Sequence, residues 1–253
     1  MTSILFICAL AEEKQALTDI LGGAQNTQII NAQLAIEVSQ YQQGSLDIYI
    51  CQSGMGNVNA AVQLALILST IKIQQIVLLG VGGALHSRLN IGDMIVSNRV
   101  IQHDYYSSLV QGNFLMRPGD LILDPLQAQD YDPIMHSIDS HFNLLPLAHP
   151  HVKVIEGLVA SGSEFVGTAQ RKQAIHQQCH QALLVDMEAS AVAAVALRYN
   201  IAFLIAKTVS DKLHSDGSIS NDFTNFLANA SRNAAIVAQS IIEKNLEITL
   251  KSN

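Results

Sequence analysis

The sequence predicts a three-layer α/β/α sandwich with a mixed central sheet, formed by residues 1–253 as a single domain. Two observations predict this fold. Short apolar runs recur along the chain, as expected for strands that helices cover on both faces. Helix-like segments lie between these runs, and this alternation is typical of α/β proteins. A chain of 253 residues that is 49% apolar is also long enough to bury one substantial core.

The elements can be placed along the chain from these patterns. The apolar runs that we interpret as strands are Ile4–Ala9, Leu46–Gln52, Gln75–Leu79, Asp93–Val100, Gly157–Ser161, Ala182–Val185 and Phe203–Val209. The segments that we interpret as helices are Ala11–Leu21, Val58–Thr70, Glu188–Tyr199 and the long amphipathic segment Asn221–Asn245. Turns are expected at Gly22-Gly23 and Gln42-Gln43-Gly44. The stretch from His103 to Leu147 is the least regular, and we interpret it as a surface excursion with one short helix.

Composition restricts the class of function. The net charge of -7 and the lack of a basic run argue against nucleic acid and anionic membranes as partners. Only 14% of the residues are charged, so we expect a partner subunit to cover part of the surface. The three cysteines lack the spacing of a disulfide framework or a zinc site, which favours buried thiols in a reducing cytoplasm. The apolar run Ile4–Leu10 is too short to span a membrane and is a poor signal peptide.

Metal and nucleotide-cofactor motifs are not found in the sequence. The nine histidines are scattered, and none is paired at the spacing of a helical metal site, so no metal ion or other cofactor is expected. Neither a P-loop nor a nucleophile elbow occurs.

Two glycine-rich segments follow predicted strands. Ser53-Gly54-Met55-Gly56-Asn57 lacks the third glycine of the dinucleotide fingerprint, so a plain turn and a ligand-contacting loop both remain open. Gly80-Val81-Gly82-Gly83-Ala84-Leu85 holds three glycines in four positions. This density favours a backbone wall against a flat or sugar-like ligand over turn geometry alone.

Acidic residues follow several predicted strands, where α/β enzymes place their sites. Asp186 and Glu188 lie two residues apart, so both would point to one face of extended backbone. The alternative is that Asp186 caps the next helix and Glu188 favours its first turn. Ser210-Asp211 and Glu12-Glu13 also follow strands, and for these acids catalysis and helix capping both remain open.

Taken in order, these motifs resemble the nucleoside phosphorylase/nucleosidase superfamily, and within it most closely the bacterial 5'-methylthioadenosine/S-adenosylhomocysteine nucleosidases. The resemblance covers nearly the whole chain. The matching segments are Ala9–Glu13, Ser53–Gly56, Gly80–Leu85, Ile91–Asp93, His103-Asp104, Ser161–Phe165, Asp186–Ala189 and Ser210-Asp211. The resemblance implies a homodimeric enzyme that uses water to cleave the N-glycosidic bond of a purine nucleoside, without a cofactor.

The resemblance also implies a role for each site residue. Glu13 would be the base that polarises the attacking water, and Asp211 the acid that protonates N7 of the leaving purine. The residues expected to bind the substrate or support these groups are Met187 and Glu188 at the ribose, Phe165 and Val166 at the purine, Ser210 beside Asp211, and Gly82, Val81 and Lys207. These roles suit the reaction, because glycoside cleavage develops positive charge on the sugar and negative charge on the base. Asp211 would have to hold or share a proton at neutral pH, which burial favours.

Several positions depart from the family pattern. Val81 stands where relatives have Ser, and Lys207 where they have Arg, and both positions help to hold the attacking water in the family. Val81 cannot hydrogen-bond through its side chain, and Lys207 keeps the charge but lacks the planar guanidinium. The usual Gly-Asp-Ala-Phe is replaced by Gly162-Ser163-Glu164-Phe165, and the loop after His103-Asp104 differs from the family's. These departures affect the substrate assignment more than the reaction.

Three alternatives remain open. A phosphorylase would use arginines to bind phosphate, but Leu78 occupies a typical arginine position and the charge of Glu13 would repel phosphate. A futalosine or aminodeoxyfutalosine hydrolase would use the same site chemistry. A nucleoside-binding protein without turnover belongs to a different class. The acids Glu13, Glu188 and Asp211 argue against it, because binding alone needs no acid above the purine.

Overall fold

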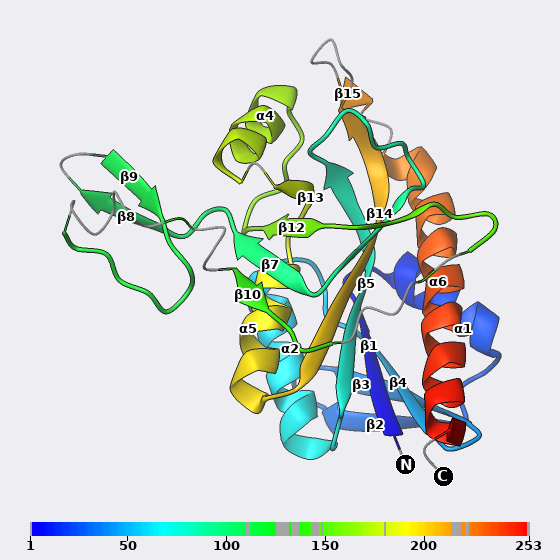
Figure 1. The fold of residues 1–253 in the computed structure, drawn as a ribbon. Helices are drawn as coiled ribbons and strands as arrows, with labels where there is room; N and C mark the ends of the chain where they lie inside the picture. The colour runs from blue at the N-terminus through cyan, green and yellow to red at the C-terminus, as the bar shows by residue number, and fades with distance from the viewer. Residues whose placement is uncertain are drawn as a thin grey trace.

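One large mixed sheet lies between two layers of helices in the computed structural model (Figure 1), as predicted from the sequence. The structure describes residues 2–109, 112–124, 132, 137–142, 147, 149–179, 181–213, 219–220 and 223–251. The helices are α1 (Ala11–Leu21), α2 (Asn57–Thr70), α4 (Ala169–Gln178), α5 (Ala189–Tyr199) and α6 (Phe223–Lys251). None of the described helices combines the length and the apolar content that crossing a membrane requires.

The sheet is built around strands from both ends of the chain. Its strands are β1 (Thr2–Cys8), β2 (Asn26–Asn31), β3 (Ile36–Gln43), β4 (Leu46–Gln52), β5 (Gln75–Ala84), β6 (Met94–Ser97), β7 (Arg99–Gln102), β10 (Ile138–Asp139), β11 (Val154–Glu156), β12 (Leu158–Ser161), β13 (Ala182–Asp186), β14 (Ala202–Leu213) and β15 (Ile219–Ser220). A separate hairpin consists of β8 (Tyr106–Leu109) and β9 (Gly112–Leu115) and projects from the body in Figure 1.

The strand directions bring several strand ends to one edge of the sheet. β1 pairs in parallel with β4 on one side and with β5 on the other, and β14 pairs in parallel with β5. The carboxyl ends of these four strands therefore meet at the same edge, where α/β folds place their ligands. The last residues of β5 turn to pair antiparallel with β13, which brings the end of β13 to the same region.

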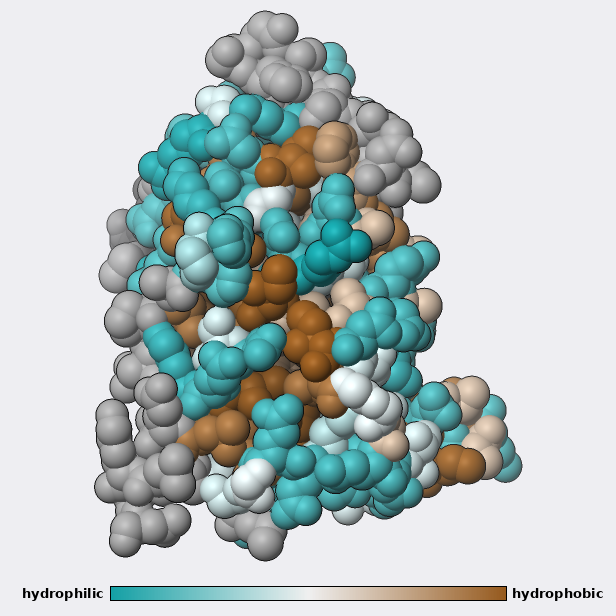
Figure 2. All heavy atoms as spheres, turned by 90° about the vertical axis from the view of Figure 1, so that its right-hand side faces the viewer, coloured by the Kyte–Doolittle hydropathy of each residue, from teal (hydrophilic) through white to brown (hydrophobic). Residues whose placement is uncertain are grey.

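The core has two halves because side chains alternate between the faces of a strand. Leu5 and Ile7 of β1 pack in a cluster with apolar residues of α2 and α5. Ile4, Phe6 and Cys8 of the same strand pack in a second cluster with residues of α1 and α6. All five side chains are fully buried, which explains why the sequence of β1 is a continuous apolar run. The outer face around α1 and α6 is mostly polar, with apolar patches between the polar side chains (Figure 2).

Most predicted elements are found, with small shifts at their ends. The clearest correction concerns the predicted strand Asp93–Val100, which is two strands, β6 and β7, that separate at Asn98. β6 pairs with β14 and β11, whereas β7 pairs with β12 and β10, so the chain changes partners there. A single apolar run cannot reveal such a change, because both strands are buried.

In the excursion between His103 and Leu147, the described residues include strands that were not predicted from the sequence. The described residues there form the β8–β9 hairpin and the short strand β10, and none of them is helical. Pro125, Pro133 and Pro146 of this stretch lie outside the described residues. Helix α4 and the hairpin of β2 and β3 were not predicted from the sequence.

Candidate active site

A cavity of about 580 Å³ opens at the edge where the strand ends meet. Its lining residues are Ala9, Leu10, Glu13, Met55, Val81, Gly82, Gly83, Glu164, Phe165, Val166, Val185, Asp186, Met187, Glu188, Ser210 and Asp211. Every predicted site residue except Lys207 is therefore part of one cavity, although they come from five separate segments of the sequence.

Glu13 is held in the cavity wall by backbone N–H groups. It lies in the first turn of α1, is 1% exposed, and accepts hydrogen bonds at Oε2 from the N–H groups of Ala9 (2.8 Å) and Leu10 (2.9 Å). Its Oε1 accepts a third from the N–H of Val81 at 3.0 Å. A carboxylate has about four acceptor sites, so one site on Oε1 remains for a water or a substrate group. Burial raises the pKa of Glu13, while the charge of Lys207 opposes this shift. Glu12, its neighbour, is exposed.

The glycines at the end of β5 make room for the carboxylates. Gly80 has a φ of 151°, and a side chain there would collide with the carboxylate of Glu13. A Cβ at Gly83 would lie 3.1 Å from Oδ1 of Asp211. Gly82 and Gly83 do line the cavity, as the predicted backbone wall requires. The glycines thus leave space for the carboxylates of Glu13 and Asp211 and also form part of the cavity surface.

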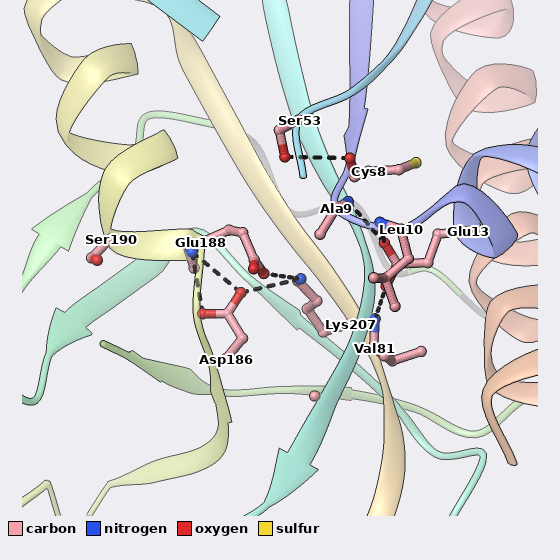
Figure 3. A network of polar contacts seen from close by, with 12 residues as sticks. Cys8, Ala9, Leu10, Glu13, Ser53, Val81, Asp186, Glu188, Ser190 and Lys207 are labelled. Carbon is pink, nitrogen blue, oxygen red and sulfur yellow. Dashed lines mark hydrogen bonds and ion pairs between the residues drawn. The ribbon is translucent and has the colours of Figure 1, made fainter. Parts of the chain in front are cut away.

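Two carboxylates share one buried lysine on the opposite wall. Lys207 of β14 lies with its Nζ 3.2 Å from Oδ2 of Asp186 and 3.1 Å from Oε2 of Glu188 (Figure 3). Asp186 also accepts a hydrogen bond from the N–H of Ala189 at the start of α5, so capping and ion pairing both hold for this residue. Glu188 accepts a second hydrogen bond, from the N–H of Gly56 at 2.9 Å. The prediction that both acids face one side is confirmed.

The charges around Lys207 are coupled by burial. Burial favours the neutral amine, but the carboxylates of Glu188, Asp186 and Glu13 hold the pKa of Lys207 above its usual value. Burial raises the pKa of Asp186, and the positive charge of Lys207 opposes that shift. Lys207 is therefore a charged residue outside the cavity lining, and it contacts both Asp186 and Glu188.

Asp211 also lines the cavity and directly follows a β-bulge. The register of β14 against β5 shifts between Val209 and Asp211, so Ser210 is the extra residue. Bulges re-aim side chains and often border active sites. The hydroxyl of Ser210 lies 3.1 Å from the carbonyl oxygen of Gly82, to which it can donate, and 3.2 Å from Oδ1 of Asp211. The hydroxyl of Ser210 therefore lies within hydrogen-bonding distance of the Asp211 carboxylate.

Sequence reasoning missed the partner of Asp211. Lys172 of α4 is fully buried, and its Nζ forms an ion pair with Oδ2 of Asp211. The pattern contained a signal, because Lys172, Ile175 and Cys179 recur at helical spacing and all three are fully buried. A lysine on the apolar, buried face of a helix needs a buried anionic partner.

The remaining predicted residues also line the cavity. Phe165 follows β12 and is 64% exposed. Val166 and Met187 line the cavity beside it. Aromatic rings at such positions can stack on flat ligands. Among the described residues, no group of three or more His, Cys, Asp or Glu could hold a metal ion.

Comparisons with known proteins agree with this geometry. The family model of the phosphorylase superfamily matches residues 3–243. The 5'-methylthioadenosine/S-adenosylhomocysteine nucleosidase of Staphylococcus haemolyticus is 27% identical over 237 residues, which are 94% of this chain and 97% of that protein. The enzyme of that name from Staphylococcus aureus is 29% identical over 198 residues, covering 78% and 82%.

Solved structures share the fold. The nucleosidase of the same name from Helicobacter pylori, complexed with a pyrrolopyrimidine ligand, has a TM-score of 0.80 and 21% identity, covering 96% of this chain and 98% of that one. The futalosine hydrolase of Helicobacter pylori has a TM-score of 0.79 and 21% identity, with the same coverage. At this identity the two structures support the fold, and they do not distinguish between substrates.

Proposed function

Because this chain belongs to the phosphorylase superfamily, we propose that it is an enzyme that hydrolyses the N-glycosidic bond of a purine nucleoside. The favoured substrates are 5'-methylthioadenosine and S-adenosylhomocysteine, which would give adenine and a 5-thioribose and so serve methionine salvage. One observation carries the proposal: Glu13, Glu188 and Asp211 line a single cavity, and each is fixed by its own hydrogen-bonding or ionic partners.

The positions of the acids suit the charges that develop during cleavage. The sugar becomes positively charged and the purine negatively charged as the bond breaks. Glu13 and Glu188 place carboxylates on the side assigned to the sugar, where Glu188 would bind the ribose hydroxyls with the backbone of Met187. Asp211 would protonate N7 of the purine, with Phe165 stacked on its face and the Val166 backbone at its edge.

Hydrolysis is favoured over phosphorolysis by the charge of the cavity wall. Neither Arg nor Lys is among the described residues that line the cavity. Phosphate carries negative charge and is normally bound by such cations. The two buried lysines nearby, Lys172 and Lys207, are already paired with carboxylates. The open acceptor site on Glu13 suits a water molecule, which can donate a hydrogen bond to it.

Futalosine or aminodeoxyfutalosine is the second candidate substrate class. The side chain of Val81 lines the cavity and cannot hydrogen-bond, although its backbone N–H still holds Glu13. This departure from the family pattern keeps a different nucleoside open as the substrate.

A substrate panel tests the assignment. Purified enzyme would be incubated with 5'-methylthioadenosine, S-adenosylhomocysteine, futalosine, aminodeoxyfutalosine and inosine, and free bases would be measured by HPLC. We expect the highest kcat/KM with the first two nucleosides. A preference for futalosine or aminodeoxyfutalosine would move the assignment to the second candidate, and no base release from any nucleoside would contradict the proposal.

We propose that the chain acts as a cytoplasmic homodimer. Helix α2 contains no charged residue, and it exposes Val58 (76%) and Val62 (44%) beside the exposed Met55. Apolar patches of this kind mark interaction surfaces. The three buried, unpaired cysteines suit a reducing compartment.

The oligomeric state can be measured directly by sedimentation. The double variant Val58→Lys with Val62→Lys should convert the dimer to a monomer. Ile29→Lys, at an exposed apolar residue of β2, is the matched control. A monomeric wild-type chain would contradict the proposed assembly.

A further inference from the structure

The buried ion pair between Lys172 and Asp211 has no role in the reaction as described so far. Lys172 is fully buried and is not among the residues that line the cavity, whereas Asp211 lines it. Lys172 can therefore act on a bound purine only through Asp211. Its position on α4 is fixed by the N-terminal cap at Thr168, whose hydroxyl accepts the N–H of Arg171 at 3.3 Å.

Gly83 has no side chain, and this leaves space for the ion pair. A Cβ at Gly83 would lie 3.0 Å from Nζ of Lys172 and 3.1 Å from Oδ1 of Asp211, so a larger residue would press on both groups. Burying an ion pair rarely stabilises a fold more than apolar residues of the same size would. A buried lysine beside a cavity carboxylate is therefore better explained by what it does to that carboxylate.

We propose that Lys172 is a positioning residue that stabilises the carboxylate which Asp211 becomes after it protonates the leaving purine. This inference rests on the proposed function. In the step, the O–H bond of Asp211 breaks and an N–H bond forms at N7 of the purine. The electron pair of the broken glycosidic bond remains on the purine. The negative charge left on Asp211 then lies against the ammonium of Lys172, which keeps its own protons.

The charge of Lys172 therefore distinguishes two states of the purine. A substrate whose N7 carries no proton can accept a hydrogen bond only from protonated Asp211, a state that the ammonium of Lys172 does not stabilise. A purine whose N7 carries a proton meets Asp211 as an ionised acceptor, and Lys172 stabilises that state. An interaction that is stronger with the protonated purine than with the substrate lowers the activation barrier of the reaction.

Two stable nucleoside analogues differ in whether position 7 can donate a hydrogen bond to the carboxylate of Asp211. In 9-deazaadenosine the ring carries an N–H at position 7, and its carbon–carbon bond to the sugar is not hydrolysed. In 7-deazaadenosine position 7 carries a C–H and cannot donate a comparable hydrogen bond. Their sizes are nearly equal, so the ratio of their dissociation constants isolates the hydrogen bond to Asp211.

The test measures both dissociation constants by calorimetry for the wild type, Lys172→Met and Lys172→Arg. We expect the preference for 9-deazaadenosine to fall about tenfold or more in Lys172→Met, as for loss of charge from a charge-assisted hydrogen bond. Lys172→Arg should retain most of it. Lys153→Met, at a lysine that is 61% exposed, is the control and should leave the ratio unchanged. In turnover assays, Lys172→Met should lower kcat more than it raises KM.

Other results would overturn the inference in distinguishable ways. An unchanged ratio in a folded Lys172→Met protein would show that Lys172 has no influence through Asp211, while the proposed function would stand. An equal loss of the ratio in Lys172→Arg would assign the effect to shape and not to charge. If the wild type binds neither analogue and releases no purine, the proposed function fails and the inference with it. Lys172→Gln provides the same comparison if the methionine variant does not fold.

Discussion

Replacing Glu13 with glutamine keeps the shape of the side chain but removes its charge and one acceptor oxygen. The carboxylate accepts two backbone N–H groups at Oε2 and one at Oε1. An amide oxygen in the Oε2 position retains the first two bonds, and its NH₂ group then faces the N–H of Val81. The open acceptor site on Oε1, which we assign to the attacking water, is lost in this arrangement.

The expected effects on stability and on rate differ in size. One buried donor without a partner costs about 1–3 kcal/mol. Burial raises the pKa of Glu13, so ionising it in the folded chain costs free energy that the neutral amide avoids, and this offsets part of the loss. The net change is small against a typical stability of about 5–15 kcal/mol, so the variant should fold. Loss of a general base should lower kcat about 10²–10⁴-fold.

The assay compares initial rates of adenine release with thermal unfolding of the same samples. Glu12→Gln is the matched control, because it makes the same change at the exposed neighbouring residue. We expect the control to retain full activity. A folded Glu13→Gln enzyme with more than about a tenth of the wild-type kcat/KM would refute the assignment of Glu13 as the base.

Four further predictions follow from the same site. Asp211→Asn should remove nearly all turnover of purine nucleosides while binding survives, and a residual rate above about a tenth of wild type would be too high for the loss of a general acid. Glu188→Gln should weaken substrate binding and lower kcat, because ribose contacts strengthen as the sugar becomes charged. An unchanged kcat/KM would leave Glu188 only its pairing with Lys207. Val81→Ser combined with Lys207→Arg should raise the rate of hydrolysis of 5'-methylthioadenosine. The two substitutions must be tested together, because the effects of neighbouring changes need not add. Loss of activity would indicate a site tuned for another nucleoside. Glu13 must be ionised to act as the base, and burial raises its pKa above the usual 4.5. The fall of kcat/KM on the acidic side should therefore have its midpoint above pH 4.5. A midpoint at or below pH 4.5 would contradict this role.

The sequence was most informative where a pattern is local. Helix α1 and strand β4 have the predicted bounds, because an apolar run and an amphipathic segment with acidic residues in its first turn are recognisable without knowledge of their neighbours. The positions of Glu13, Glu188 and Asp211 after strands left catalysis and capping open, and only the resemblance to the nucleosidase family joined the three acids in one predicted site. Parallel strands bring such ends together regardless of the distance between them in sequence.

What depends on distant partners was not predictable. The ion pair of Lys172 with Asp211 joins residues 39 positions apart through a helix that the sequence did not reveal. The glycines of β5 were interpreted as a surface for the ligand, but Gly80 is required because the Glu13 carboxylate lies against it. Lys207 was assigned to the attacking water by resemblance, and its contacts to Asp186 and Glu188 are visible only in the folded chain.

The central claim is that this site cleaves a purine nucleoside with water. The most direct measurement is the release of adenine from 5'-methylthioadenosine in phosphate-free buffer, repeated with added phosphate, with both products identified by mass spectrometry. The account predicts adenine and unphosphorylated methylthioribose at equal rates in both buffers. Cleavage that requires phosphate and yields a sugar 1-phosphate would contradict it.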